Sequence, residues 1–146
     1  MLQENGTHRK NKDEIQKENE MHLVGFEEWL RKKGLSQKTI NTHVSNVDFY
    51  INDYLCYYDM LDVSQGVREI HGFLGSWFIR KATWSSCAHI KTNAASIKKF
   101  YAYLHDKSVI AKEDYDDLCW TIKEYMPDWL VEMKRYEDLI FEDYYY

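Results

Sequence analysis

The chain has few of the residues that cross-link or interrupt a fold. Its 146 residues include three cysteines, Cys56, Cys87 and Cys119, which are widely spaced and form no CxxC pair. An odd number of scattered thiols excludes a disulfide framework and is typical of a reducing compartment. Proline occurs once and glycine six times, which excludes collagen-like and linker-like classes of protein.

Long apolar runs are also absent. No stretch approaches the ~20 apolar residues that a membrane-spanning helix needs. The polar first segment, MLQENGTHRKNKDE, contains no apolar core of a signal peptide. We therefore expect a cytoplasmic protein with no membrane partner.

The alternation of apolar and polar residues that marks β-strands is missing, and so are hairpin turn signals. Apolar residues instead recur every three or four positions, which is the spacing of one face of an α-helix. This pattern predicts an all-α fold, a compact bundle of five to six helices. The two clearest faces are formed by Ile40, Val44, Val47, Ile51 and Leu55, and by Ile90, Ala94, Ile97, Tyr101 and Leu104.

Caps and breakers divide the chain into three parts: a polar tail over 1–20 that becomes helical toward its end, a helical domain over 21–110, and acidic C-terminal helices with a tail over 111–146 that pack on or extend it. Glycine favours the left-handed end of a helix, and serine favours its start. The first expected helices are one over 21–33, stopped at Gly34, and one from Ser36 to about 58, followed by a loop over 59–64. A helix through 67–78, in which Gly72 and Gly75 allow close packing, leads to a loop over 80–86. A helix through 90–104, capped by Ser85 or Ser86, then precedes a turn over 106–110, a helix over 112–126 and a last helix that begins at Pro127.

Charge is unevenly distributed. The whole chain carries a net charge of −5, but residues 111–146 carry −7, whereas residues 31–107 carry +5. A local basic surface decides which partners bind more than the total charge does. The net acidity therefore does not exclude nucleic acid as a partner of the middle of the chain.

Two stretches resemble a known family. They are FEEWL (26–30) with KGLS (33–36) and Thr39, and IK (90–91) with ASIKKFYAYL (95–104). Their order and separation are similar to those of the N-terminal SAM-like core-binding domain of tyrosine recombinases, which include phage integrases. The resemblance covers about residues 22–110. It implies a helical domain that grips double-stranded DNA, with the helices that begin at Ser36 and near Ser86 lying across the major groove.

Polar and basic side chains lie off the apolar faces of these two helices and in the loop before the second. Lysine and arginine neutralise phosphates, while hydroxyls and helix amides hold phosphate oxygens. The candidate DNA-binding residues are Ser36, Lys38, Asn41, Thr42, Ser45, Arg80, Lys81, Ser86, Lys91, Thr92, Lys98 and Lys99.

Catalytic signatures are missing. Tyrosine recombinases transfer phosphoryl groups with a tyrosine nucleophile inside a cluster of arginine, histidine and lysine, because charge develops on the phosphate oxygens. Here the His-x-x-Arg pairing is absent and the five arginines are dispersed. We expect Tyr144, Tyr145 and Tyr146 to be an acidic tail rather than nucleophiles. The chain is therefore expected to be a non-catalytic module, accessory to or a remnant of DNA recombination, with no cofactor and no small-molecule substrate.

Plainer interpretations remain open. The lysines of the 90–104 helix are also what a solvated helix face carries. Cys87, His89 and Cys119 lack the ligand spacing of a metal site. Most tryptophans suit a core, and Trp84, beside Arg80 and Lys81, is the exception. The alternative function is a protein-interaction module that has lost DNA binding and contacts a partner, such as a full-length recombinase or another protein, through its acidic, aromatic C-terminus.

Overall fold

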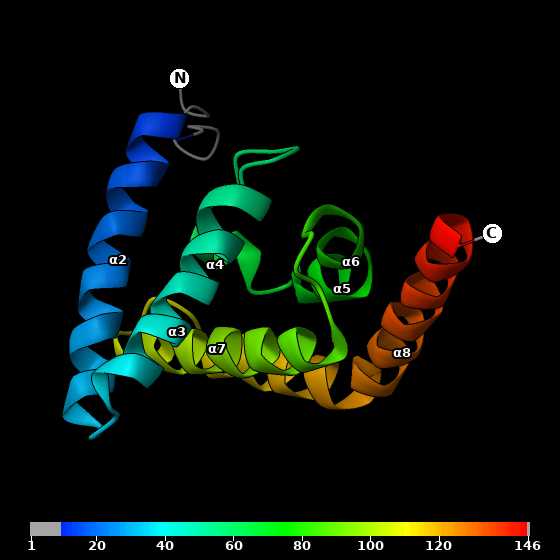
Figure 1. The fold of residues 1–146 in the computed structure, drawn as a ribbon. Helices are drawn as coiled ribbons and strands as arrows, with labels where there is room; N and C mark the ends of the chain where they lie inside the picture. Colours follow the sequence, from blue (N-terminus) through cyan, green and yellow to red (C-terminus); the bar gives the residue numbers. More distant parts are fainter. Residues whose placement is uncertain (1–9, 146) are drawn as a thin grey trace.

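A computed structural model describes the backbone of residues 10–145 and the side chains of residues 10–142. Within this range the chain is helical and contains no strand (Figure 1). The predicted all-α bundle is confirmed. Six helices result, because η1 continues α3, and because α5, η2 and α6 follow one another without a break. The elements are α2 Lys12–Lys32, α3 Gln37–Asp48, η1 Phe49–Tyr54, α4 Val63–Gly66, α5 Ile70–Gly72, η2 Phe73–Trp77, α6 Phe78–Lys81, α7 Cys87–Asp106 and α8 Lys112–Tyr145.

Helix α2 begins earlier than the sequence predicted, so the expected tail over 1–20 is wrong from residue 12 onward. Asn11 accepts a hydrogen bond from the backbone of Glu14, and the Glu14 carboxylate accepts one in return from the backbone of Asn11. Such a reciprocal cap satisfies two backbone donors at the start of a helix. The buried side chains of Ile15 and Asn19 then fasten this first part of α2 to the core. Residues 1–9 of the expected tail lie outside the described residues.

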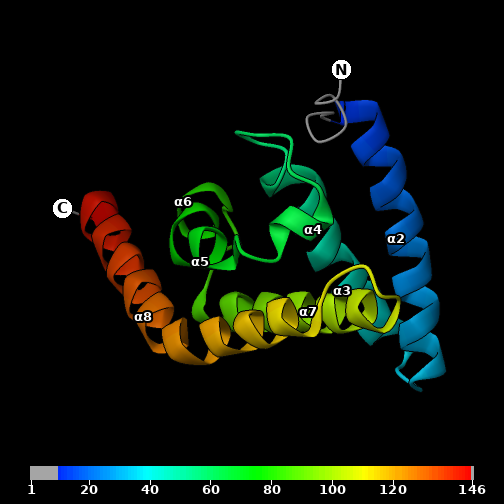
Figure 2. The ribbon, with the colours of Figure 1, turned by 180° about the vertical axis from the view of Figure 1, so that it is seen from behind.

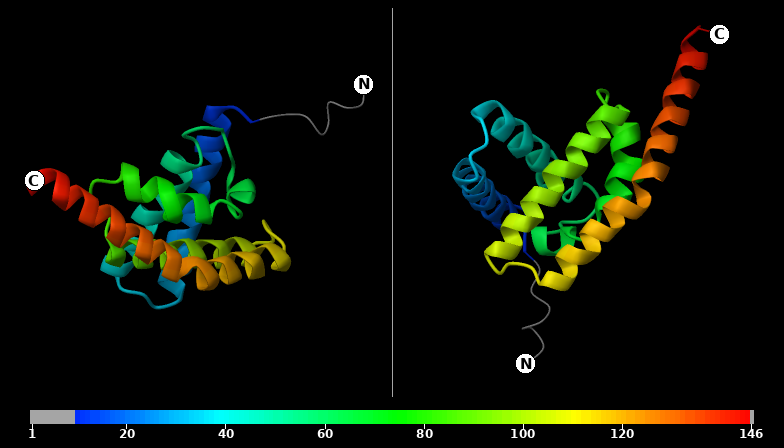
Figure 3. Two further views of the ribbon diagram at one scale, coloured as in Figure 1. Left: turned by 90° about the vertical axis from the view of Figure 1, so that its right-hand side faces the viewer. Right: turned by 90° about the horizontal axis from the view of Figure 1, so that it is seen from below.

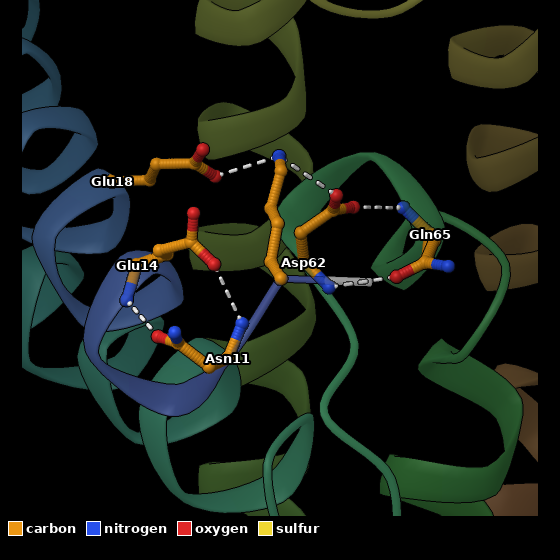
Figure 4. Close-up of polar contacts among 6 residues, drawn as sticks. Asn11, Glu14, Glu18, Asp62 and Gln65 are labelled. Atoms are coloured by element: carbon orange, nitrogen blue, oxygen red, sulfur yellow. Dashed lines mark hydrogen bonds and ion pairs between the residues drawn. The ribbon is translucent and has the colours of Figure 1, made fainter. Parts of the chain in front are cut away.

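Lys10 ties the start of α2 to the start of α4 through Glu18 and Asp62, two carboxylates that Figure 4 shows near each other. Its Nζ lies 2.9 Å from Oε1 of Glu18 and 3.2 Å from Oδ2 of Asp62. Asp62 also caps α4 through a reciprocal pair of hydrogen bonds with Gln65. The hydrogen bond to Glu18 is the main reason that the pKa of Lys10 is raised. Lys10 therefore links two capped helix starts through a contact with Asp62, 52 residues further along the sequence.

The two predicted apolar faces form the centre of the core. On α3 and η1, Ile40, Val47 and Ile51 are almost fully buried, and Val44 is half-buried. Every predicted core residue of α7 is buried too. Gly34, with φ of +88°, ends the turn after α2, and Ser36 caps α3. These parts of the prediction are confirmed, because they depend on residue spacing and local capping alone.

The region before α7 differs from the prediction. The helix formed by α5, η2 and α6 continues to Lys81, so Arg80 and Lys81 are helical rather than part of a loop. It continues because Ile79 and Ala82 are buried against the core. Gly75 allows a close approach, as predicted: a Cβ atom there would lie 3.0 Å from the ring of Trp129.

The expected break at Pro127 is also wrong. Helix α8 runs through it without interruption and bends midway, so that its second half turns toward α5 and α6 (Figure 2). Proline inside a helix removes one backbone hydrogen bond and kinks the helix, but packing can hold the two halves together. Trp129 and Met133 provide that packing, and Nε1 of Trp129 donates to Nδ1 of His71 over 2.9 Å. Among the described helices, none has the length and apolar character required to cross a membrane.

Candidate nucleic-acid interface

The candidate residues on α3 and α7 face outward from two helices that pack against each other. The hydroxyl of Ser36 accepts from the backbone of Thr39, and that of Ser86 accepts from the backbone of His89, so each caps its helix. Ser86, rather than Ser85, is thus the cap of α7. We call the outward surface of these two helices the α3–α7 face.

The two helices run in opposite senses along this face. Leu35, just before α3, lines one hollow with the middle of α7, whereas the later part of α3 lines another hollow with the first turns of α7. As a result, the caps Ser36 and Ser86 lie at opposite ends of the face. The face therefore has two ends of different chemistry.

The first end is basic. Lys98 and Lys99 of α7 and Lys33, which follows α2, line one hollow of about 410 Å³. The Nζ of Lys33 lies 4.8 Å from the centre of the Trp29 ring, which lines the same hollow. Lys33 was not among the predicted site residues, because it was interpreted only as a favourable charge at the end of a helix. Its place beside Lys98 depends on the packing of α2 against α7, for which the sequence carries no local signal.

These lysines are free of carboxylate partners. Lys91, Lys98 and Lys99 are exposed, and no ion pair within 4.0 Å joins them or Lys33 to a described residue. Several other cations of the described chain are ion-paired, namely Lys10, Arg31, Arg68, Lys112, Lys134 and Arg135. The positive charge of the α3–α7 face is therefore available to an anion from solution.

The second end is polar and uncharged. Asn41, Thr42 and Ser45 of α3 meet Thr92 of α7 around a hollow of about 510 Å³, which Asn46, Trp84 and His89 complete. Some of these groups already have partners: the hydroxyl of Thr42 donates to the Lys38 carbonyl, and that of Thr92 donates to the Ala88 carbonyl. The Ser45 hydroxyl forms no hydrogen bond with a described residue. Hydroxyls and amides of this kind can hydrogen-bond phosphates or base edges.

Trp84 is the exposed tryptophan that the sequence singled out. Its side chain is 49% exposed, and its ring packs edge-on against Phe49 with 5.3 Å between centroids. Trp120, expected to be in the core, is instead 58% exposed on α8. It lies just after the buried Leu118, so the helix turns it outward.

Two carboxylates limit the polar end. Asp48 and Asp53 line a neighbouring hollow of about 310 Å³ together with Ser45 and Trp84. Burial raises the pKa of Asp53, and the nearby charge of Asp48 raises it further. The face is therefore graded, from lysines at the start of α3 to carboxylates near the end of α3.

Arg80 and Lys81 are not brought to this face with the other candidates. The guanidinium of Arg80 donates to the Ser76 hydroxyl, and Arg80 lines a groove between α6 and α8. The Nζ of Lys81 lies 5.3 Å from the centre of the Tyr57 ring. Because both residues belong to α6 rather than to a loop, their side chains point to surfaces other than the α3–α7 face.

No metal-binding cluster of three His, Cys, Asp or Glu residues occurs among the residues described. Cys87 Sγ donates to the carbonyl of Leu130 over 3.7 Å, and Cys119 lies beside Tyr115. Burial, followed by the hydrogen bond with Cys119, raises the pKa of Tyr115 to about 12. The side chains of Tyr144, Tyr145 and Tyr146 lie outside the described residues.

Comparison with known proteins adds no relative. No family model matches the chain. Neither a curated protein nor a solved structure matches it.

Proposed function

We propose that this chain binds double-stranded DNA through the α3–α7 face as a non-catalytic module of the cytoplasm. Its sequence resemblance to the core-binding domain of tyrosine recombinases supports this proposal, and so does the chemistry of the face. The role would be accessory to, or a remnant of, DNA integration or recombination. DNA is the partner, and no cofactor or small-molecule substrate takes part.

One observation carries the proposal: Lys33, Lys98 and Lys99 converge on one hollow from two different parts of the chain without a carboxylate partner among the described residues. Like charges repel, so gathering them costs free energy that a bound anion would offset. The phosphates of a duplex supply such an anion at regular intervals along the backbone.

The remaining groups of the face suit the same ligand. Lys91 lies seven residues before Lys98, two helical turns along α7, and both are exposed. The capped start of α3 adds partial positive charge near the lysine end. Asp48 and Asp53 oppose binding at the other end, so the affinity should be modest and strongly dependent on salt.

A titration of a labelled duplex tests the proposal. We expect the wild-type chain to bind a duplex of about 30 base pairs, and to lose affinity as salt rises from about 50 to about 200 mM. The double variant Lys98→Ala and Lys99→Ala should weaken binding to every duplex alike, because phosphate contacts carry no sequence information. The log–log slope against salt should flatten by about one unit for each phosphate that the variant no longer neutralises.

Lys17→Ala is the matched control. Lys17 is an exposed lysine on α2 without an ion-pair partner among the described residues, and it lies 16 residues before Lys33, or about 24 Å along the helix. Its removal should leave affinity and slope unchanged. A double variant that keeps wild-type affinity and slope would eliminate the α3–α7 face and favour the protein-interaction alternative. Protein-dependent nicking of supercoiled plasmid would contradict the non-catalytic part of the proposal.

A further inference from the structure

A groove of about 680 Å³ separates α6 and the segment after it from the second half of α8. Its floor is apolar, since Ile79, Ala82 and Met133 line it and are almost fully buried. On the α8 wall, Ile140 is 48% exposed and Phe141 is 56% exposed. The groove shares no lining residue with the hollows of the α3–α7 face.

The end of α8 extends past the rest of the molecule, as the right panel of Figure 3 shows. Leu139 is 48% exposed there, beside Ile140 and Phe141. Leu139 and Ile140 are neighbouring large apolar residues, and their exposure is costly in water and typical of a surface that a partner covers. The second half of α8 is thus one wall of its own groove and also an apolar helix that fits an equivalent groove.

Opposite charges stand on the two walls. Arg80 comes from α6 and Glu137 from α8, and both line the groove. Among the described residues neither has an ion-pair partner within 4.0 Å, and the guanidinium of Arg80 has the Ser76 hydroxyl as its hydrogen-bond acceptor. Each wall therefore offers one charge to a ligand that brings the opposite charge beside an apolar helix.

We propose that the groove accepts the second half of α8 from a second copy of this chain, forming a two-fold symmetric dimer. In such a dimer each copy gives one α8 and receives one, so the same surface is used twice. Arg80 of each copy then meets Glu137 of the other. Ile140 and Leu139 are then buried twice, once in each copy. An unrelated partner that occupies one groove would bury these residues only once.

The helix segment also sets the strength of the contact. From Met133 to Ile140 it spans about two helical turns, or ~11 Å. A contact of this length, even doubled by symmetry, lies at the small end of the range for specific interfaces. We therefore expect reversible association in the micromolar range or weaker.

Sedimentation of the full chain tests the dimer. The wild-type mass should rise from 17.6 kDa toward twice that value as concentration increases from about 1 μM to about 1 mM. Ile140→Glu places a charge in the apolar part of the groove and should weaken association at least about tenfold. Val131→Glu is the control, because Val131 is 67% exposed on the same helix and does not line the groove. Circular dichroism should show both variants equally helical.

A charge exchange separates contact between two copies from effects within one chain. Arg80→Glu alone should be monomeric, since it would face Glu137 of its partner, and Glu137→Arg alone should be monomeric for the converse reason. Mixing the two variants should restore a dimer, because both Arg80–Glu137 contacts are then complementary again. A variant that merely disturbs its own fold could not be rescued by the other.

Three results would overturn the dimer: a wild-type mass of 17.6 kDa at every concentration, an Ile140→Glu variant that associates as tightly as the wild type, or a mixture of the charge variants that stays monomeric. The first result would show that the groove does not bind a second copy of the chain. None of them bears on DNA binding, which is measured with other residues and another ligand.

Discussion

The ring nitrogen Nδ1 of His43 lies 2.7 Å from the hydroxyl oxygen of Ser96, and this contact joins α3 to α7 beneath the α3–α7 face. The Ser96 hydroxyl has one proton, which it donates to the Thr92 carbonyl over 3.0 Å. It therefore accepts from Nδ1 of His43, as it does from the Asn46 amide over 3.0 Å. In its neutral form His43 therefore carries its proton on Nδ1, and an added proton must go to Nε2.

This arrangement predicts that stability falls with acid. Burial, followed by the charge of Lys99, lowers the pKa of His43. The unfolded chain then binds a proton near pH 6.5 before the folded chain does, so the free energy of unfolding decreases as pH drops below that value. His22, whose pKa is lowered mainly by burial, acts in the same direction. Urea denaturation at pH 7.5 and 5.5 measures the loss.

His43→Gln provides the comparison. Its amide can still donate to Ser96 but cannot titrate, so this variant should lose less stability than the wild type between the two pH values. An equal loss in both proteins would show that His43 does not contribute to the acid sensitivity.

Ile97 marks the centre of the core. Its side chain is fully buried on α7. Ile97→Ala should reduce the free energy of unfolding by about 2–5 kcal/mol, because it removes buried methylene groups and leaves a cavity. Val131→Ala, at an exposed site, should change it by less than about 0.5 kcal/mol. Similar losses in both variants would mean that α7 does not form the centre of the core.

Gly25 permits the close packing of α2 on α7. Alanine normally stabilises a helix interior by about 1 kcal/mol relative to glycine, but a Cβ atom at position 25 would collide with the hydroxyl of Tyr103. We therefore expect Gly25→Ala to be destabilising, although helix propensity alone predicts the opposite. Adding Tyr103→Phe removes the colliding oxygen but leaves the ring carbon Cζ 2.9 Å from the added Cβ atom, so it should recover part of the loss in thermal unfolding. If the second substitution fails to rescue the first, the collision is not the cause.

Asp48 should limit DNA affinity. It lines the hollow next to the polar end of the α3–α7 face. Asp48→Asn removes a charge that repels phosphate, so duplex affinity should rise by about twofold at low salt, and the gain should vanish near 1 M salt, where the screening length is only about 3 Å. Asp128→Asn on α8 is the control. Equal gains in both variants would indicate a general effect of net charge rather than a local one.

Part of the fold could be predicted from the sequence. The spacing of Ile90, Ala94 and Ile97 identified the buried face of α7, and Ser36 and Gly34 identified a helix start and a helix stop. The outward lysines of α7 followed from the same spacing, since residues off the apolar face must point to solvent. Such features depend on neighbours within one or two helical turns.

Tertiary packing decided the rest. Helix α8 passes Pro127 because Trp129 and Met133 pack beyond it, and Arg80 stays helical because Ile79 and Ala82 are buried around it. Lys33 joins Lys98 only because α2 packs against α7. The spacing of residues along the chain fixes which side of a helix is apolar. Which helices then meet depends on contacts between residues far apart in the sequence, and those contacts assembled both the α3–α7 face and the groove beside α8.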